Sequence, residues 1–209
     1  MTAIIDYNAG NLTSVRLALE ALGAPCVVTR DPAAVAGAER IVFPGVGAAG
    51  AAMASLRGLG LDAAIRSAVA RAVPFLGICL GAQILLERSA EDGGVETLGI
   101  LPGEVVRIAP TAPRAKIPHM GWNQAELSRP HPVWKGVASG ADFYFVHSFC
   151  MVPSDSASAL CTTEYGGFTF VSAIARANVV ATQFHVEKSG RTGLDVLANF
   201  LAWDGREGA

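Results

Sequence analysis

The sequence predicts an α/β fold: a mostly parallel central sheet with flanking helices, followed by a strand-rich second half. In the first half, short apolar runs typical of buried strands alternate with amphipathic helical stretches. That order is expected of a parallel sheet with right-handed crossovers. From about residue 98 to residue 175 the pattern becomes rich in strands and loops, and a helical pattern then closes the chain.

Apolar periodicity predicts the elements of the first half. Strands are expected at residues 3–6, 26–29, 40–43 and 74–78, where short apolar runs are bounded by polar residues, glycine or proline. Two helices are expected between them, each from apolar residues at helical spacing. Their apolar stripes are Leu12, Val15, Leu19 and Leu22, which ends at Gly23, and Leu61, Ile65 and Val69.

The second half is predicted to add strands and one helix. Strands are expected at residues 105–108, 143–146 and 168–174, and the closing helix at 190–203. We find no linker, repeat or low-complexity tract that would divide the chain. Residues 1–209 are therefore predicted to form a single domain.

Composition excludes several classes of function. The 209 residues are 51% hydrophobic with a net charge of -2, and the 16 Lys and Arg residues are scattered, so no nucleic-acid footprint is present. The four cysteines form no C-x-x-C pair or zinc spacing, which indicates a reducing cytoplasm and no metal site. The N-terminus lacks the pattern of a secretory signal. The longest uncharged runs are interrupted by proline and glycine, so no membrane segment is expected.

Cys79 lies between two glycines where an apolar strand is predicted to run into a helix. The segment is PFLGICLGAQ, residues 74–83. In the G-x-S-x-G turn of serine hydrolases the nucleophile occupies such a corner, and the glycines are needed because a Cβ there would collide with neighbouring backbone. The first turn of the helix would direct N–H groups at the sulfur and favour the thiolate. A buried, purely structural cysteine is the alternative that this segment alone leaves open.

A histidine and a carboxylate follow near the other end of the chain. The segment VVATQFHVE, residues 179–187, is predicted to be a strand, in which residues i and i+2 share a face. His185 and Glu187 are therefore expected on one side, with the imidazole toward a thiol and the carboxylate fixing its tautomer. Alone, the pair could be exposed residues at a strand end. Together with Cys79, it favours a Cys-His-Glu triad.

The segment GVGAAG, residues 45–50, fits the G-x-G-x-x-G pattern of dinucleotide sites. Such a site also needs an acidic residue at the end of the next strand, about 20 residues later, whereas Asp62 begins a helical stretch. The same glycines could instead provide a backbone N–H donor for an oxyanion beside the nucleophile. A plain tight turn is the third interpretation.

The segments around Cys79 and His185 resemble those of the class I glutamine amidotransferases: GICLGAQ at 77–83 and QFHVEKS at 183–189. Four more resemble the glutaminase subunits of imidazole glycerol phosphate synthases of histidine biosynthesis: DYNAGN at 6–11, PGVG at 44–47, PHMGWN at 118–123 and YFVHS at 144–148. The resemblance implies the single-domain, flavodoxin-like fold of that class. Two positions depart from the usual pattern: Val186 replaces a proline and Phe149 a tyrosine.

The resemblance also implies the chemistry. Cys79 attacks the side-chain carbonyl of glutamine, His185 carries the proton to the departing nitrogen, and Glu187 orients His185. Ammonia leaves as the thioester forms, and water then cleaves the thioester to glutamate; no cofactor is implied. The implied oxyanion donors are the N–H of Leu80 and a group from Val46 and Gly47. The residues implied to hold glutamine are Gln83, Glu91, His147, Ser148 and Phe149.

A partner is implied as well, because free ammonia would be lost to solvent. The family partner is a cyclase with a (β/α)8-barrel fold, which uses the ammonia to form imidazole glycerol phosphate and an aminoimidazole carboxamide ribotide within a heterodimer. The residues expected at this interface are Asn11, His119, Met120, Trp122, Asn123, Tyr144 and Lys188. For Trp122 and Tyr144, ordinary core packing is the alternative.

Other functions remain compatible with the triad or with the glycine loop. A glutaminase of pyridoxal 5′-phosphate synthase would keep the triad but should lack the PHMGWN segment. A thiol peptidase or γ-glutamyl hydrolase would act on larger substrates without a partner. A non-catalytic ligand-binding module built on the glycine loop would need no triad.

Overall fold

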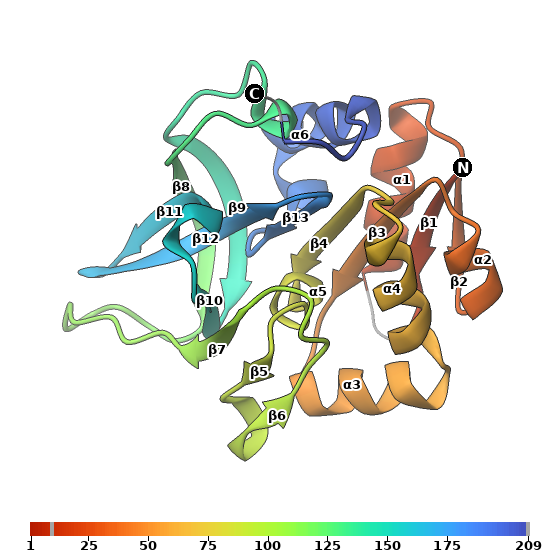
Figure 1. The fold of residues 1–209 in the computed structure, drawn as a ribbon. Helices are drawn as coiled ribbons and strands as arrows, with labels where there is room; N and C mark the ends of the chain where they lie inside the picture. Colours follow the sequence, from red (N-terminus) through yellow and green to blue (C-terminus); the bar gives the residue numbers. More distant parts are fainter. Residues whose placement is uncertain (9–10, 208–209) are drawn as a thin grey trace.

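The computed structural model describes residues 1–8 and 11–207, so Ala9 and Gly10 of the DYNAGN segment lie outside the described residues. One sheet runs through the molecule and carries helices on both faces (Figure 1). The helices are α1 (Leu12–Ala21), α2 (Pro32–Ala36), α3 (Ala49–Gly58), α4 (Leu61–Ala70), α5 (Leu80–Gln83) and α6 (Gly190–Ala202). Single turns of 3-10 helix are η1 (Glu91–Gly93), η2 (Pro132–Trp134), η3 (Ser156–Ser158) and η4 (Val186–Lys188).

The strands follow the predicted division of the chain into two halves. The first half contributes β1 (Thr2–Ile5), β2 (Cys26–Thr29), β3 (Arg40–Gly45), β4 (Phe75–Cys79), β5 (Arg88–Ser89) and β6 (Val95–Glu96). The second half contributes β7 (Gly103–Arg107), β8 (His119–Leu127), β9 (Ala141–His147), β10 (Phe149–Pro153), β11 (Ala159–Tyr165), β12 (Phe168–Arg176) and β13 (Val179–Thr182). All of the strands predicted from residues 3 to 78 are present.

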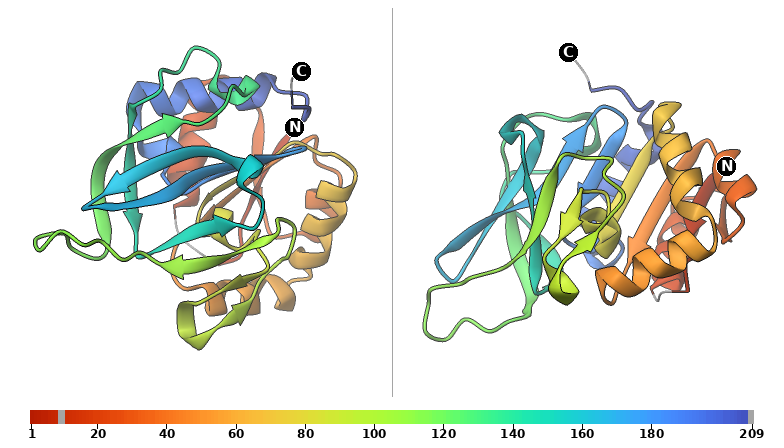
Figure 2. Two further views of the ribbon diagram at one scale, coloured as in Figure 1. Left: turned by 60° about the vertical axis from the view of Figure 1, so that its left-hand side comes forward. Right: turned by 60° about the horizontal axis from the view of Figure 1, so that its bottom comes forward.

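The sheet is parallel on one side and antiparallel on the other. Strands β2, β1, β3, β4 and β13 lie side by side in parallel, which confirms the predicted α/β fold. From β13 onward the pairing is mostly antiparallel, through β12, β10 and β7. A branch of β11, β8 and β9 curls away from β12, as Figures 1 and 2 show. The catalytic candidates lie near the junction of these two parts.

Helices cover both faces of the parallel strands because consecutive residues of a buried strand point to opposite sides. Ile4 and Ile5 of β1 belong to two different apolar clusters. Ile4 packs in the cluster of α1 and α6, and Ile5 in the cluster of α3 and α4. Figure 2 shows these two helix pairs on opposite sides of the sheet.

The turn from β4 into α5 leaves no space for side chains at its glycines. A Cβ on Gly81 would collide with the carbonyl oxygen of Phe43 in β3, and one on Gly77 would lie 2.9 Å from the Cα of Ala82. A Cβ on Gly45 would overlap the backbone N of Gly81. The backbone of α5 therefore packs directly against the backbone of β3 and β4, and the glycines flanking Cys79 have the steric role that their spacing predicts.

Two local predictions were wrong. The strand expected over residues 179–187 ends at Thr182, and residues 186–188 form the single turn η4. The helix expected after Cys79 is also a single turn, α5. After Thr182 the chain leaves the sheet: the Thr182 hydroxyl donates to the Phe184 carbonyl, and the His185 N–H to the Tyr144 carbonyl. These contacts replace the ladder hydrogen bonds that would have continued the strand.

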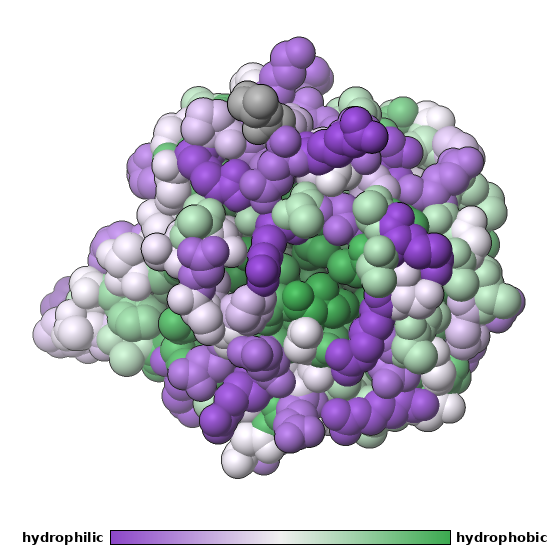
Figure 3. Space-filling model, viewed as in Figure 1, coloured by the Kyte–Doolittle hydropathy of each residue, from purple (hydrophilic) through white to green (hydrophobic). Residues whose placement is uncertain are grey.

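The surface in Figure 3 carries hydrophilic side chains around much of its rim and a hydrophobic area near its centre, over the region of α5. Across residues 1–8 and 11–207, no helix is both long enough and apolar enough to pass through a bilayer.

Candidate active site

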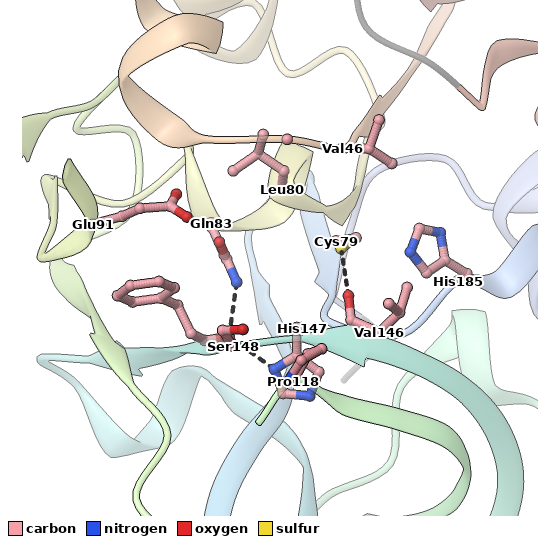
Figure 4. Close-up of a pocket in the computed structure, with 12 residues that line it drawn as sticks. Val46, Cys79, Leu80, Gln83, Glu91, Pro118, Val146, His147, Ser148 and His185 are labelled. Carbon is pink, nitrogen blue, oxygen red and sulfur yellow. Dashed lines mark hydrogen bonds between the residues drawn. The ribbon is translucent and has the colours of Figure 1, made fainter. Parts of the chain in front are cut away.

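Cys79 is the last residue of β4 and has a strained backbone. Its φ of 55° and ψ of -113° lie outside the regions that L-residues normally adopt. This is the geometry of a nucleophile elbow, in which a sharp strand-to-helix turn presents the side chain at the edge of the sheet. The thiol donates to the Val146 carbonyl at 3.8 Å (Figure 4).

His185 and Glu187 form a buried hydrogen-bonded pair. The Nδ1 atom of His185 lies 2.7 Å from Oε1 of Glu187, and both side chains are almost fully buried. The Asn11 amide donates to the same Glu187 oxygen. Figure 4 shows the His185 ring facing Cys79, and among the described residues its Nε2 atom has no hydrogen-bond partner. The predicted triad residues are thus brought together, although a 3-10 turn and not a strand joins His185 to Glu187.

The surroundings of His185 favour its protonated form. Burial lowers the pKa of His185, but Cys79 and Glu187 beside it raise the pKa more strongly, to about 10. An imidazolium at neutral pH can hold a thiolate on one side and supply a proton to a leaving group.

A cavity of about 280 Å³ opens in front of Cys79 (Figure 4). It brings together all of the residues predicted to hold the oxyanion and the substrate. Its lining consists of Val46, Gly47, Cys79, Leu80, Gln83, Glu91, Pro118, Val146, His147, Ser148, Phe149 and His185.

The start of α3 is already occupied by carboxylates of this chain. Oε2 of Glu91 accepts from the Ala49 N–H at 2.8 Å, and Oδ2 of Asp92 from the Gly50 N–H at 3.2 Å. Helix N-termini that bind phosphates need these amides free. The GVGAAG segment therefore does not form a phosphate cradle, and Glu91 both tethers α3 and borders the cavity.

Four of the residues predicted at a partner interface belong to β8, and they fall on both faces of that strand. Met120 and Trp122 are 62% and 58% exposed, and the Trp122 ring packs edge-on against Tyr144 of β9. His119 is only 2% exposed because its side chain points to the opposite face, between Phe145 and Tyr165. The prediction that His119 makes a rim contact is therefore wrong.

His119 instead pairs with His147 inside the protein. Nδ1 of His119 lies 3.0 Å from Nε2 of His147. Burial lowers the pKa of His119 to about 4 and that of His147 to about 3. Both rings are therefore neutral near pH 7, as is His131, whose pKa burial lowers to about 4.

We expect these three histidines to make folding sensitive to acid. A pKa that is lower in the folded state gives stability that is present above the unfolded value and lost as pH falls. When the pH falls from 7 to 5, each of His119, His131 and His147 should lower the free energy of unfolding by about 2 kcal/mol. The raised pKa of His185 has a weaker effect of the opposite sign. Denaturant unfolding at both pH values measures this, and His131→Phe should remove about a third of the difference. Equal stability at the two pH values would contradict it.

Two residues contact the triad that were not predicted to do so from the sequence. Asn11, expected at the partner interface, donates to Glu187. Gln183 is fully buried; its Oε1 accepts from Gln83 at 3.0 Å and its Nε2 lies 3.9 Å from the Cys79 sulfur. A polar amide just after the apolar run of residues 179–181, between Thr182 and Phe184, was the signal that could have identified Gln183.

Comparisons with known proteins agree with this geometry. The family model "Glutamine amidotransferase class-I" matches residues 3–203. The "Imidazole glycerol phosphate synthase subunit HisH" of Aromatoleum aromaticum is 50% identical over 209 residues, covering 96% of this chain and 97% of that protein. The protein of the same name from Moorella thermoacetica is 50% identical over 198 residues, covering 95% and 92%.

Solved structures share the fold at lower sequence identity. A glutamine amidotransferase from Methylobacillus flagellatus superimposes with a TM-score of 0.68 at 17% identity, over 100% of this chain and 96% of that one. A chain of PurLQS from Thermotoga maritima gives a TM-score of 0.69 at 18% identity, over 96% and 97%. With the elbow, the buried His-Glu pair and a family match across nearly the whole sequence, the chain belongs to the class I glutamine amidotransferases.

Proposed function

We propose that this chain is the glutaminase subunit of an imidazole glycerol phosphate synthase and acts in histidine biosynthesis in the cytoplasm. The observation that carries the proposal is the Cys79-His185-Glu187 arrangement at the edge of a cavity that Gln83 and Glu91 also line. Two relatives about half identical over nearly their full lengths bear the name of that subunit. Glutamine hydrolysis, assayed with and without a cyclase and its nucleotide substrate, tests it.

The mechanism follows from the positions of the groups around Cys79. The sulfur, its proton passed to His185, attacks the glutamine carboxamide carbon, and the developing oxyanion is held by backbone donors at Leu80 and the Val46–Gly47 loop. His185 protonates the departing nitrogen as the C–N bond breaks, which releases ammonia and leaves a thioester on Cys79. Water, deprotonated by His185, then cleaves the thioester to glutamate and returns the thiol. Glu187 keeps His185 in the required tautomer throughout.

Glutamine recognition is assigned to Gln83, Glu91 and the 147–149 backbone. The Gln83 amide donates to the Phe149 carbonyl at 2.9 Å, so its Oε1 is left to accept from the α-ammonium group of the substrate. Glu91 adds negative charge at the same end of the cavity. This arrangement favours a free amino acid over a peptide, whose α-nitrogen carries no charge.

The proposed partner face is the outer side of β8 and β9, formed by Met120, Trp122, Tyr144 and Val146. Large exposed apolar side chains such as Trp122 and Met120 are typical anchors of an interface. Val146 also lines the catalytic cavity, so the face borders the site where ammonia is released. We propose that a (β/α)8-barrel cyclase docks here, with Asn11 and Lys188 at the periphery of the contact. Asn123 was also predicted at this interface, but it lies on the same face of β8 as His119 and its amide donates to His119 and to the Glu164 carbonyl.

We expect the isolated chain to hydrolyse glutamine slowly and to be stimulated about 10²- to 10³-fold by the docked, substrate-loaded cyclase, mainly in kcat. The reason is the oxyanion loop: Val46 and Gly47 line both the catalytic cavity and a second cavity of about 250 Å³, and Gly47 has a φ of 95°. The free volume of the two cavities beside this loop allows the peptide to adopt more than one orientation. Steady-state kinetics at saturating glutamine measure the effect.

Trp122→Ala should reduce this stimulation without lowering the rate of the isolated chain. Val152→Ala is the matched control, because Val152 is also an exposed apolar residue but lies on β10, away from the proposed partner face. An isolated chain as fast as the complex would contradict the loop argument, and equal stimulation of the Trp122 variant would contradict the proposed face.

A further inference from the structure

A chain of buried hydrogen bonds, separate from the His185–Glu187 pair, ends at the nucleophile. Its inner part contains Phe149, Gln83, Gln183 and Cys79. The Phe149 carbonyl can only accept, so Gln83 must direct Nε2 toward it, at 2.9 Å. The same Nε2 donates to Oε1 of Gln183 at 3.0 Å. Gln183 is thereby fixed with its own donor, Nε2, toward the Cys79 sulfur at 3.9 Å.

The outer part of the chain reaches β8 through two histidines. The Phe149 carbonyl also accepts from Nδ1 of His147, at 2.8 Å, so the neutral His147 ring has a lone pair on Nε2. His119 must then donate from Nδ1, and its Nε2 accepts from the Asn123 amide at 3.3 Å. Asn123 also donates to the Glu164 carbonyl at 2.9 Å. Each tautomer and amide orientation is thus determined by its neighbour.

Burial makes this chain cooperative. His119, His147, Gln83 and Gln183 are all buried, and a buried polar group that loses its partner is costly. Removing one member therefore leaves the next without a partner and frees it to reorient. Disturbance at His119 can in this way reach Gln183, although the two side chains are not in contact.

The thiol has a separate partner in each of its protonation states. The neutral thiol donates to the Val146 carbonyl at 3.8 Å, whereas a thiolate cannot donate and needs donors of its own. Gln183 supplies one, and its long contact with a neutral sulfur should tighten once the sulfur is charged.

We propose that Gln183 is a catalytic residue that donates a hydrogen bond to the Cys79 thiolate, and that Gln83, His147 and His119 are positioning residues that hold this donor toward the sulfur. The proposal rests on the assignment of Cys79 as the nucleophile and adds to it. These hydrogen bonds also connect β8 to the nucleophile, because Asn123 and His119 belong to the strand that carries Met120 and Trp122.

The pH dependence of Cys79 alkylation by iodoacetamide tests the donor directly. The full-length chain with Cys26→Ser is suitable, because Cys150 and Cys161 are buried and their thiol pKa values are raised by burial, that of Cys150 to about 12. Gln183→Leu should move the midpoint of the profile to higher pH and slow alkylation at neutral pH about tenfold, with kcat for glutamine falling in parallel. The titratable side chains that face the thiol, His185 and Tyr7, are unchanged in this variant.

Gln183→Glu gives a second measurement at the same position, should the leucine variant fail to fold. It retains an oxygen for Gln83 but replaces the donor with a negative charge, so alkylation at neutral pH should slow more than tenfold. An unshifted alkylation profile in a folded Gln183 variant would overturn the proposal, since it would leave the amide a packing role only. Hydrolysis surviving in Cys79→Ala would instead overturn the assignment of the nucleophile.

His119→Phe tests the positioning role in the part of the hydrogen-bond series that is remote from Cys79. This variant keeps a ring between Phe145 and Tyr165 but removes both hydrogen bonds, so alkylation at neutral pH should slow about threefold. His131→Phe is the matched control, because His131 is also buried and neutral but takes no part in this series of hydrogen bonds. The Cys79 alkylation profile of the His131 variant should equal that of the protein with all four histidines intact. Identical profiles for the His119 and His131 variants would overturn the positioning role.

Discussion

Replacing Cys79 with alanine is expected to abolish glutamine hydrolysis, by about 10⁶-fold, the loss typical of removing a covalent nucleophile. The strained turn that presents Cys79 would remain, because the flanking glycines and not the thiol determine its packing. The variant should therefore fold, bind glutamine and remain catalytically inert. Ammonia release from glutamine, measured with the cyclase and its substrate present, provides the test.

The same variant should still support the partner's reaction when ammonium salt replaces glutamine, because only the source of ammonia is lost. Cys26→Ala is the control, since Cys26 is an unpaired thiol on the outer strand β2. Loss of both glutamine-dependent and ammonium-dependent synthesis in Cys79→Ala would mean that the residue is structural.

Glu187→Gln is expected to slow hydrolysis by about 10⁴-fold while leaving the fold intact, as in other triads whose carboxylate is replaced by an amide. Oε1 of Glu187 accepts from His185 at 2.7 Å and also accepts from Asn11. An amide cannot supply the counter-charge, and it can stabilise the wrong tautomer of the ring. Glu187 is among the groups that raise the pKa of His185 to about 10, so the alkaline limb of the pH-rate profile should shift to lower pH in the variant.

Glu91→Gln distinguishes a triad effect from a general loss of negative charge at the cavity. Glu91 borders the same cavity, but its carboxylate caps α3 and does not touch His185. We expect this variant to raise KM for glutamine with a much smaller change in kcat. If Glu187→Gln hydrolysed glutamine at the full rate across neutral pH, Glu187 would not be needed for catalysis and the site would be a Cys79-His185 dyad.

The elbow was predictable because its determinants are local. An apolar strand, a cysteine and two closely spaced glycines lie within ten residues, and the structure places β4, Cys79 and α5 in that order. The contact between His185 and Glu187 was predicted for the wrong reason. Their spacing of two suits a strand, but the chain leaves the sheet after Thr182 and a 3-10 turn brings the two side chains together.

Features that depend on strand pairing were not predictable. His119 and Trp122 are three residues apart, and which of them faces inward is set by the register of β8 on β9, where His119 pairs with His147 and Trp122 with Tyr144. A one-residue shift would have exposed His119 and buried its neighbours. Gln183 likewise acquires its contacts only when β4, β10 and the loop after β13 meet.

The backbone contact between Gly45 and Gly81 limits how this site can diversify. A methyl group at either position would force β3 away from α5, and a methyl group at Gly77 would collide with the backbone of Ala82. A saturation library that is selected for activity should therefore recover only glycine at all three positions. Gly58 has nothing within 4 Å of its missing Cβ, and Gly58→Ala should be tolerated or mildly stabilising. The oxyanion loop and the nucleophile turn are consequently expected to be retained or lost together when the sequence changes. An engineer who transplants either segment into a related scaffold must carry the other one with it.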